Sequence, residues 1–381
     1  AIVNQGRMNF GHAWYGYVNQ SEFPYEKFPE YYARDREGKI RLFDSDWSST
    51  NFCSTNPEVI AIVAKKVNAF FAAHPDAPVC SLDPNDYGPM CLCDRCLALD
   101  KQYGQTKEDG IDVTDRLIHF SNEIARRLDP AYREKYLGIL IYAYQMELPL
   151  SAKPHPRHAG MICKFPPRYD HSRAWNDPTS AKNRDFFRLL LGWGSQLTQL
   201  GYYDYYNHYY YFGPFGVLHT LREELPAFRE LGGTFLVLES DPNFATQGVN
   251  SYVAAALQWD LDADVDLLLE DLCTRFYGPA AAEMRTFVEY AEANWPKATK
   301  DVKVIDQLNA DLKAARAKAG DTVCGKRIDL LVAFMEPLLQ KRDQLAKGRG
   351  NVPKIRAYTR DRPPALDGDL SMAGLNPAAL P

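Results

Sequence analysis

Short β-type runs alternate with helical patterns through roughly the first 260 residues of this 381-residue chain, and this alternation constrains the fold most strongly. Such an order is typical of parallel strands that are joined by crossover helices. The predicted strands span Met8 to Trp14, Pro78 to Asp86, Leu137 to Tyr144, Ala159 to Phe165, Leu197 to Tyr205 and Thr234 to Ser240. The predicted helices between them span Pro57 to Ala73, Asp115 to Leu128, Ser180 to Leu200 and Leu218 to Leu231.

This pattern favours a (β/α)8 TIM-type barrel, an α/β fold in which catalytic groups follow the carboxyl ends of the strands. Because six strands are predicted, we favour the explanation that the first strands of the barrel were not included in this chain. After residue 262, helices are predicted at Val265 to Tyr277, Ala280 to Trp295, Val302 to Ala319 and Lys326 to Ala346. We expect a barrel domain over residues 1–262, a helical C-terminal region over 263–347 and a Pro/Gly-rich tail over 348–381.

The composition excludes several classes of protein. With 46% hydrophobic and 24% charged residues, the chain has the balance of an ordinary globular protein. A formal net charge of -5 offers no basic excess for phosphates, so we expect no nucleic-acid partner. Since no run of about 18 apolar residues occurs, we expect no membrane span. The chain begins directly with Ala1-Ile2-Val3-Asn4, and we expect a secreted or periplasmic protein whose export signal has been removed.

Aromatic residues are unusually frequent, with 23 Tyr, 19 Phe and 6 Trp. Seven of the tyrosines crowd together at Tyr202, Tyr203, Tyr205, Tyr206, Tyr209, Tyr210 and Tyr211. Tyrosine suits stacking against sugar rings because it combines an apolar face with a polar tip. A rigid aromatic loop or an oligomer contact explains the same cluster equally well.

The segment Asp83-Pro84-Asn85-Asp86 carries acid groups at the end of a predicted strand. An apolar strand breaks there into a turn that contains Pro and Gly, which is where barrel enzymes place catalytic residues. Hydrolysis of a glycosidic bond needs a proton donor and a group that stabilises or attacks the developing cation, usually paired carboxylates. The alternative is a turn in which the Asp and Asn side chains only cap the next helix.

A second carboxylate is available at two other predicted strand ends. Glu239 ends the apolar run Phe235 to Leu238, and Asp204 lies within Tyr202-Tyr203-Asp204-Tyr205-Tyr206. Burial among aromatic rings disfavours the charged form of a carboxyl group, which is one route to a working acid. Either residue could instead anchor a neighbouring loop through hydrogen bonds.

Three thiols, Cys91, Cys93 and Cys96, directly follow the acid turn, and Cys53 comes from the preceding loop. Four cysteines suit a structural zinc ion, which is usually tetrahedral, whereas disulfides in an exported protein are the alternative. We favour zinc because closely spaced thiols converge on a metal easily, while short disulfides are strained. No cofactor is expected for catalysis itself. The remaining cysteines are expected in the core, at Cys80, Cys163, Cys273 and Cys324.

Further side chains near the predicted strand ends suit hydroxyl binding or a platform beneath a sugar ring. We expect substrate contacts from His12, Trp14, Asp83, Tyr87, Tyr142, Tyr144, Tyr203, Tyr205 and Trp259. Core packing explains the aromatic residues equally well when each is taken singly. His12 is a poor metal ligand because no second His lies near it at ligand spacing.

Six motifs follow one another in a specific order: Gly11-His12-Ala13-Trp14, Asn56-Pro57-Glu58-Val59, Asp83 to Asp86 with the three cysteines, Ala143-Tyr144, Tyr203-Asp204-Tyr205 and Phe276-Tyr277-Gly278. Together they resemble a bacterial barrel domain of formerly unknown function, over roughly residues 6 to 295. That group is similar to hexosaminidase and α-glucuronidase barrels. It includes the endo-β-N-acetylglucosaminidases of glycoside hydrolase family 163.

The resemblance implies a retaining hydrolase of β-linked, N-acetylhexosamine-containing glycans that uses the N-acetyl group of the substrate as nucleophile. By analogy, Asn85 orients this acetamide and Asp86 acts as general acid and base. Tyr144, Tyr203 or Tyr205 would hydrogen-bond the acetamide carbonyl. The related barrels use a longer Glu as the acid, so Asp86 has to act from a closer backbone.

Two other functions remain open at this stage. One is a two-carboxylate glycosidase that pairs Asp86 with Glu239 or Asp204 and acts on uronic-acid-containing polysaccharide. The other is a non-catalytic glycan-binding barrel. The expected partner is an oligosaccharide or glycoprotein glycan, and the tyrosine-rich segment also permits an oligomer.

Overall fold

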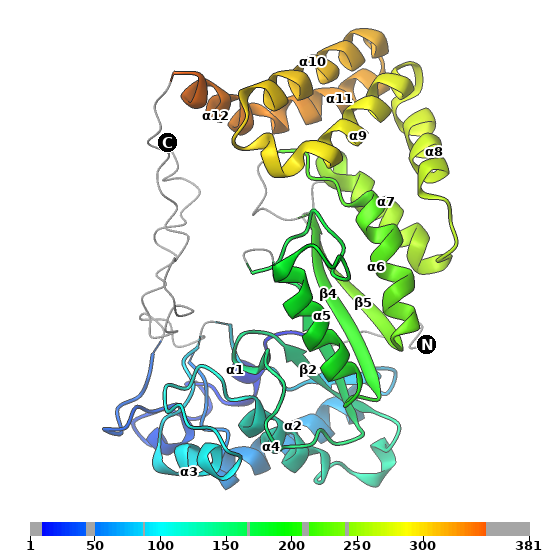
Figure 1. Ribbon diagram of the computed structural model, residues 1–381. Helices are drawn as coiled ribbons and strands as arrows, with labels where there is room; N and C mark the ends of the chain where they lie inside the picture. Colours follow the sequence, from blue (N-terminus) through cyan, green and yellow to red (C-terminus); the bar gives the residue numbers. More distant parts are fainter. Residues whose placement is uncertain are drawn as a thin grey trace. The chain divides into compact units, whose positions relative to one another are not determined.

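Five strands form one open sheet in the order β1-β2-β3-β4-β5 (Figure 1). The computed structural model describes residues 10–42, 50–86, 88–165, 168–207, 213–240 and 244–347. The strands are β1 (Val79–Ser81), β2 (Tyr136–Ile141), β3 (His158–Cys163), β4 (Gln199–Asn207) and β5 (Gly233–Ser240). β1, β2 and β3 pair in parallel, with Cys80 opposite Leu137 and Gly138 opposite Ala159. Parallel pairing brings the carboxyl ends of these strands to one edge.

The prediction of a closed eight-stranded barrel is wrong, because the described residues form an open five-stranded α/β sheet. The strand predicted from Met8 to Trp14 does not form in its described part. Gly11 has a φ of 131°, which only glycine adopts readily, and helix α1 (Trp14–Tyr17) begins three residues later. Beside β1, this segment contributes only a single parallel bridge among its described residues, between His12 and Asp83.

The predicted crossover helices all form, but the helix predicted from Ser180 to Leu200 ends at Gly194, before β4. They are α2 (Pro57–Ala73), α4 (Thr114–Ala125), α5 (Ala181–Gly194) and α6 (Leu218–Glu230). Helix α2 begins as expected because the Asn56 side chain accepts a hydrogen bond from Glu58 N, and Pro57 suits the first helical position. Further helical segments are α3 (Asp94–Gln102), α7 (Phe244–Trp259), η1 (Pro29–Tyr31), η3 (Pro130–Tyr132), η4 (Ala143–Gln145) and η5 (Gly278–Ala280).

The helical C-terminal region comprises α8 (Val265–Tyr277), α9 (Ala281–Ala298), α10 (Val302–Ala319), α11 (Val323–Phe334) and α12 (Glu336–Ala346). Asp264 and Asp301 cap the first turns of α8 and α10. The single helix predicted from Lys326 to Ala346 is divided at Met335, because Pro337 has no backbone N–H to continue the helical hydrogen bonds and is tolerated only in the first turn of a new helix. Among the helices that the structure describes, none is long and apolar enough to cross a bilayer.

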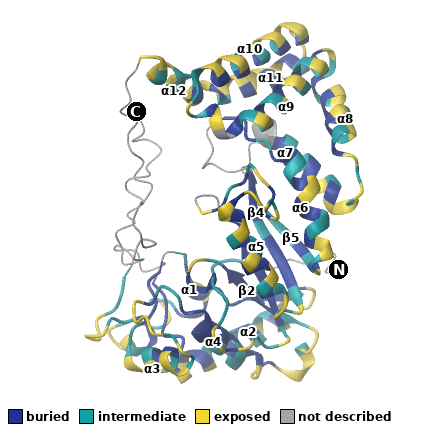
Figure 2. Ribbon diagram, viewed as in Figure 1, coloured by how far each residue is buried: buried dark blue, intermediate teal, exposed yellow. Residues whose placement is uncertain are grey.

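The chain divides into two compact units, each with its own core. The described parts of residues 1–163 and 189–202 form the first, and those of 164–188 and 203–347 form the second. In the first core, Trp14 stacks on Phe52; the second core gathers apolar side chains of α6 to α12. Figure 2 shows buried residues along β2 and exposed residues on the outer helix faces. The predicted boundary at residue 262 stays a prediction, and the predicted tail lies outside the described residues.

Asp115 ties helix α4 to the loop that follows β2. Its buried carboxylate accepts hydrogen bonds from the backbone nitrogens of Leu150 (2.7 Å), Ser151 (2.8 Å) and Ala152 (2.6 Å). These three hydrogen bonds give the buried carboxylate the partners that it needs away from water. One side chain therefore fixes the path of the chain between β2 and β3.

We expect Asp115→Ala to lower the free energy of unfolding by about 2 to 4 kcal/mol, since three backbone N–H groups lose their acceptor. Urea denaturation followed by circular dichroism measures this difference. The control is Asp76→Ala, at an exposed site, which should change stability by less than about 0.5 kcal/mol. Equal losses in the two variants would contradict the role of Asp115.

Candidate functional site

A cleft at the carboxyl ends of β1 and β2 contains the predicted acid turn. Its volume is about 50 Å³, which is room for a few water molecules or one reacting group. The residues that line it, all in the first unit, are His12, Asp83, Pro84, Asn85, Asp86, Leu140, Tyr142, Ala143, Tyr144 and Gln145. The cleft therefore lies where parallel sheets commonly bind ligands.

Asp83 is fully buried at the base of this turn. Its carboxyl group accepts a hydrogen bond from Leu140 N, and its Oδ2 lies 2.7 Å from Ser81 Oγ. Ser81 Oγ also lies 2.6 Å from Gly11 O, and one hydroxyl proton cannot serve two acceptors. A protonated Asp83 that donates to Ser81 Oγ satisfies both contacts. Burial raises the pKa of Asp83 to about 6, so the protonated arrangement applies below about pH 6.

Asp86 lies at the exposed end of the same turn, with 38% of its side chain accessible. Its Oδ1 is 3.7 Å from His12 Nε2. His12 Nδ1 lies 2.6 Å from Pro84 O and has to carry a proton, because a carbonyl oxygen can only accept. Nε2 of a neutral His12 is then an acceptor that faces Asp86 from beyond direct hydrogen-bond distance.

Asn85 holds the turn in place from within the protein. Its side-chain oxygen accepts from Tyr15 N at 2.8 Å, and its side-chain nitrogen donates to Thr50 O at 2.9 Å. Its backbone nitrogen donates to Asn51 Oδ1 at 2.9 Å. Because these contacts occupy the buried amide, we interpret Asn85 as a positioning residue for Asp86.

Tyr142, Ala143 and Tyr144 border the other side of the cleft. Ala143 has a φ of 47°, a left-handed conformation that costs a non-glycine residue about 1 to 2 kcal/mol. Such strain is found mainly at functional sites. The ring of Tyr142 lies edge-on to that of His12, with centroids 6.2 Å apart. Tyr144 is buried, and this burial raises the pKa of its hydroxyl well above the usual range.

Five of the nine predicted substrate contacts do not line the described cleft, and two of these, Tyr203 and Tyr205, belong to the second unit. Trp14 belongs to the core, where its Nε1 donates to Leu82 O at 2.7 Å. Trp259 ends helix α7, is 94% exposed and does not lie at a strand end. Tyr87 lies outside the described residues, as do the tyrosines at positions 209 to 211.

In the second unit, Tyr203 in the middle of β4 meets Glu239 near the carboxyl end of β5. The Tyr203 hydroxyl donates to Glu239 Oε2 at 2.5 Å, and both side chains are half-buried. The ring of Tyr205 lies 5.3 Å from that of Tyr203, measured between centroids. Alternate residues of a strand share one face, so Tyr203 and Tyr205 point away from the face that carries Asp204.

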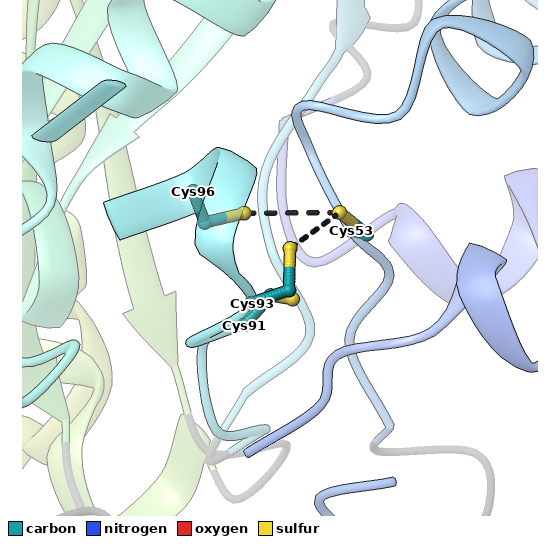
Figure 3. Close-up of side chains that lie close together, drawn as sticks. All are labelled: Cys53, Cys91, Cys93 and Cys96. Carbon is teal, nitrogen blue, oxygen red and sulfur yellow. Dashed lines mark hydrogen bonds between the residues drawn. The ribbon is translucent and has the colours of Figure 1, made fainter. Parts of the chain in front are cut away.

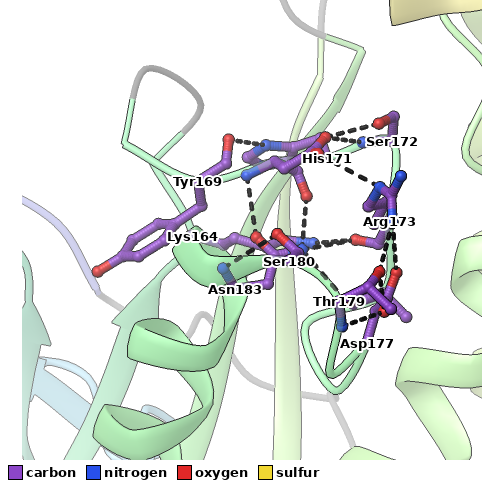
Figure 4. A network of polar contacts seen from close by, with 11 residues as sticks. Lys164, Tyr169, His171, Ser172, Arg173, Asp177, Thr179, Ser180 and Asn183 are labelled. Carbon is purple, nitrogen blue, oxygen red and sulfur yellow. Dashed lines mark hydrogen bonds and ion pairs between the residues drawn. The ribbon is translucent and has the colours of Figure 1, made fainter.

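Asp204 is part of a buried ionic network on the opposite face of β4. Its Oδ1 lies 2.7 Å from His171 Nε2, and Lys164 Nζ lies 2.5 Å from Glu224 Oε1. All four side chains are at most 1% exposed. Burial is the main cause that raises the pKa of Glu224, and Asp204 adds to it. Figure 4 shows Lys164 and His171 within the surrounding polar contacts.

Our sequence analysis did not identify Lys164, His171 or Glu224 as members of a site. One signal was present, because Lys164 directly follows the apolar strand residues Ala159 to Cys163. A lysine at the end of a buried strand needs a carboxylate partner or an exit to water. Which carboxylate serves it depends on the packing of α6, which the local pattern does not specify.

The four predicted zinc ligands converge in the first unit (Figure 3). All four Sγ atoms lie within 4.8 Å of one another, and each residue is a free thiol. Cys53, Cys91 and Cys96 are buried, and Cys93 is half-buried. Burial opposes the charged form of nearby Arg116, but Cys96 and Asp100 raise its pKa above the ordinary value. These residues could hold one metal ion.

A family model matches residues 3–289 of the chain and is described as a domain of unknown function (DUF4838). The chain belongs to the DUF4838 family. No curated protein matches the chain with significance. The DUF4838 match includes the cleft, the four cysteines and the Tyr203–Glu239 pair, so all of these features belong to the family domain.

These carboxyl groups of the DUF4838 domain lie in two environments, one buried and one partly exposed. Asp83, Asp204 and Glu224 are buried and bound within the protein, whereas Asp86 and Glu239 reach the strand ends with partial exposure. A buried, paired carboxylate stabilises the fold or positions its neighbours, while an accessible carboxylate can exchange protons with a ligand. Of these five carboxylates, Asp86 in the first unit and Glu239 in the second are the ones accessible to a ligand.

We expect Lys164→Met to lower the free energy of unfolding by about 3 to 5 kcal/mol, because Glu224 would be left buried without its cation. Arg168→Met is the matched control, since Arg168 forms an exposed pair with Asp185 and should cost at most about 1 kcal/mol. Both values come from urea denaturation at neutral pH. Similar losses in the two variants would argue against a buried network.

We expect Asp83→Asn to reduce the pH dependence of stability. A raised carboxyl pKa stabilises the folded protein below the unfolded pKa of about 4, and this contribution is lost as pH rises through about 6. Wild type should therefore lose about 2 kcal/mol more than Asp83→Asn between pH 4 and pH 8. Urea denaturation at several pH values tests this difference. Parallel pH profiles would show that the pKa of Asp83 is the same in the folded and unfolded protein.

Proposed function

We propose that this DUF4838 protein is a glycoside hydrolase of β-linked, N-acetylhexosamine-containing glycans, with Asp86 as general acid and base. The observation that carries the proposal is the position of Asp86 in the cleft. It is a partly exposed carboxylate at a strand end, on a turn that buried hydrogen bonds of Asp83 and Asn85 hold rigid. Pre-organised acids of this kind are what glycosidic hydrolysis requires.

In the proposed reaction, the carboxylic acid of Asp86 protonates the leaving glycosidic oxygen. The acetamide oxygen of the substrate attacks the anomeric carbon as the glycosidic bond breaks. The Asp86 carboxylate then takes a proton from water, and this water opens the cyclic intermediate to give a retained product. His12 lies 3.7 Å from Asp86. A protonated His12 would stabilise the negative charge of the Asp86 carboxylate.

Substrate assistance is supported by the other groups of the cleft. Among its described lining residues, Asp83 is the second carboxylate, and its contacts with Ser81 and Leu140 keep it from attacking a sugar. The buried hydroxyl of Tyr144 has no hydrogen-bond partner among the described atoms. Tyr144 lines the cleft, so its hydroxyl suits the acetamide carbonyl better than the occupied amide of Asn85.

The substrate class rests on the resemblance to glycoside hydrolase family 163, which the six motifs carry. The cleft residues Asp83 to Asp86 and Ala143-Tyr144 belong to those motifs. The proposal therefore joins a local geometry with a family resemblance.

A two-carboxylate glycosidase is the second candidate, and the Tyr203–Glu239 hydrogen bond favours it. A tyrosine hydroxyl that donates to a carboxylate holds the charged form, which is what a nucleophile needs. In that mechanism Glu239 would either attack the anomeric carbon of the sugar or activate a water molecule that does so. Uronic-acid-containing polysaccharides would then be alternative substrates.

We expect wild type to release product from a panel of N-glycans and chromogenic β-N-acetylglucosaminides. Asp86→Asn should lower kcat by about 100-fold or more, since it removes the proton donor. Asp76→Asn is the exposed control and should retain full activity. Circular dichroism confirms that each variant is folded.

Two results would count against substrate assistance. Unchanged turnover by folded Asp86→Asn would remove Asp86 from the mechanism. Binding of N-glycans by wild type without any turnover would favour a glycan-binding protein. Glu239→Gln separates the enzymatic mechanisms, because substrate assistance predicts a much smaller loss there than in Asp86→Asn.

A further inference from the structure

We propose that Cys53, Cys91, Cys93 and Cys96 bind one zinc ion, and that this ion clamps the chain segment that positions the acid turn. The inference concerns a metal site and a structural connection. It does not depend on the reaction proposed for Asp86.

The thiol geometry fits a single tetrahedral ion. Cys53 Sγ lies 3.7 Å from the sulfur atoms of both Cys93 and Cys96. A tetrahedron with zinc–sulfur bonds of about 2.3 Å has edges of about 3.8 Å. A disulfide would bring two sulfur atoms to about 2.05 Å. Four thiolate ligands in a tetrahedron are typical of zinc.

Groups around the cysteines suit thiolates. Arg34 N donates to Cys91 Sγ at 3.4 Å, and Thr55 Oγ1 lies 3.1 Å from Cys96 Sγ. Zinc with four thiolates carries a net charge of about -2, so a buried cation beside it is favourable. Arg116 is that cation: it is 1% exposed, and its Nη1 donates to Cys91 O at 2.7 Å.

The ion would join two segments that are distant in the sequence. Cys53 comes from the loop before α2, and the other three ligands precede or begin α3. Two residues before Cys53, Asn51 accepts from Asn85 N and donates from its side chain to Gly88 O. Thr50 O accepts from the Asn85 side chain. Residues 50–53 therefore contact the acid turn at one end and the metal site at the other.

This connection explains why four thiols lie beside the turn. Without metal, the thiols of Cys53 and Cys93 offer only weak sulfur hydrogen bonds to hold these segments together. With zinc bound, Asn51 is fixed in position, and through it Asn85, which precedes Asp86 in the chain. The zinc ion would thus act on Asp86 as a positioning element and never contact substrate.

The first experiment measures the metal content of the purified full chain. We expect one zinc ion per chain by mass spectrometry, and strong visible absorption of tetrahedral thiolate coordination after exchange for cobalt(II). Cys93→Ser should weaken zinc binding by at least about 10-fold. Cys324→Ser is the matched control, since Cys324 is also half-buried but lies outside the cluster, and it should keep full zinc content.

The second experiment measures hydrogen exchange of wild type before and after removal of zinc by a chelator. We expect several-fold faster exchange in residues 50–56 and 83–96, including Asn85 N–H, with little change in β3. Absence of zinc, iron in its place, or no thiolate–cobalt spectrum would overturn the metal assignment. Zinc with unchanged exchange at residues 83–86, or uniformly faster exchange throughout, would overturn the clamp.

Discussion

The buried carboxyl group of Asp83 is the interaction on which the candidate site depends. It follows β1, accepts from Leu140 N on β2, and connects through Ser81 Oγ to Gly11 O. The backbone carbonyl oxygen of Asp83 accepts a hydrogen bond from Ala13 N at 3.0 Å. Three separate segments therefore meet at one side chain. Since Pro84, Asn85 and Asp86 continue directly from it, the position of the acid depends on this junction.

Asp83 and Asp86 illustrate how environment assigns different roles to the same side chain. Asp83 is fully buried, and the geometry around Ser81 favours its protonated form. Asp86, three residues later, is partly exposed and lies within reach of His12. A pair of titratable groups in contrasting environments is a common basis for acid and base assignments. Here the buried member shapes the cleft and the accessible member faces it.

Local signals in the sequence predicted most helices and strands, but they did not predict whether the sheet closes into a barrel. The helical pattern predicted the starts of α2, α8 and α10 correctly, and the structure shows capping side chains there, at Asn56, Asp264 and Asp301. The spacing of Cys91, Cys93 and Cys96 likewise predicted their convergence with Cys53. The number of strands in a sheet and the burial of Trp14 depend on long-range packing. Strand-like composition near Gly11 therefore predicted a strand that its described residues do not form, and the alternation of strands and helices predicted a barrel that does not close.

The tyrosine-rich strand β4 shows why composition alone left Asp204 and Glu239 equivalent. Both are acids beside aromatic residues, but the alternation of a strand places Asp204 opposite to Tyr203. On its face, His171 pairs with Asp204 and Lys164 with Glu224, so that two potential cations balance two buried carboxylates. On the other face, Tyr203 holds Glu239 at partial exposure. A buried charge needs a partner of opposite sign, whereas an accessible one can be held by a single hydroxyl and still meet a ligand. The partner of each carboxylate, which only the fold reveals, therefore separates a structural acid from one that can act on substrate.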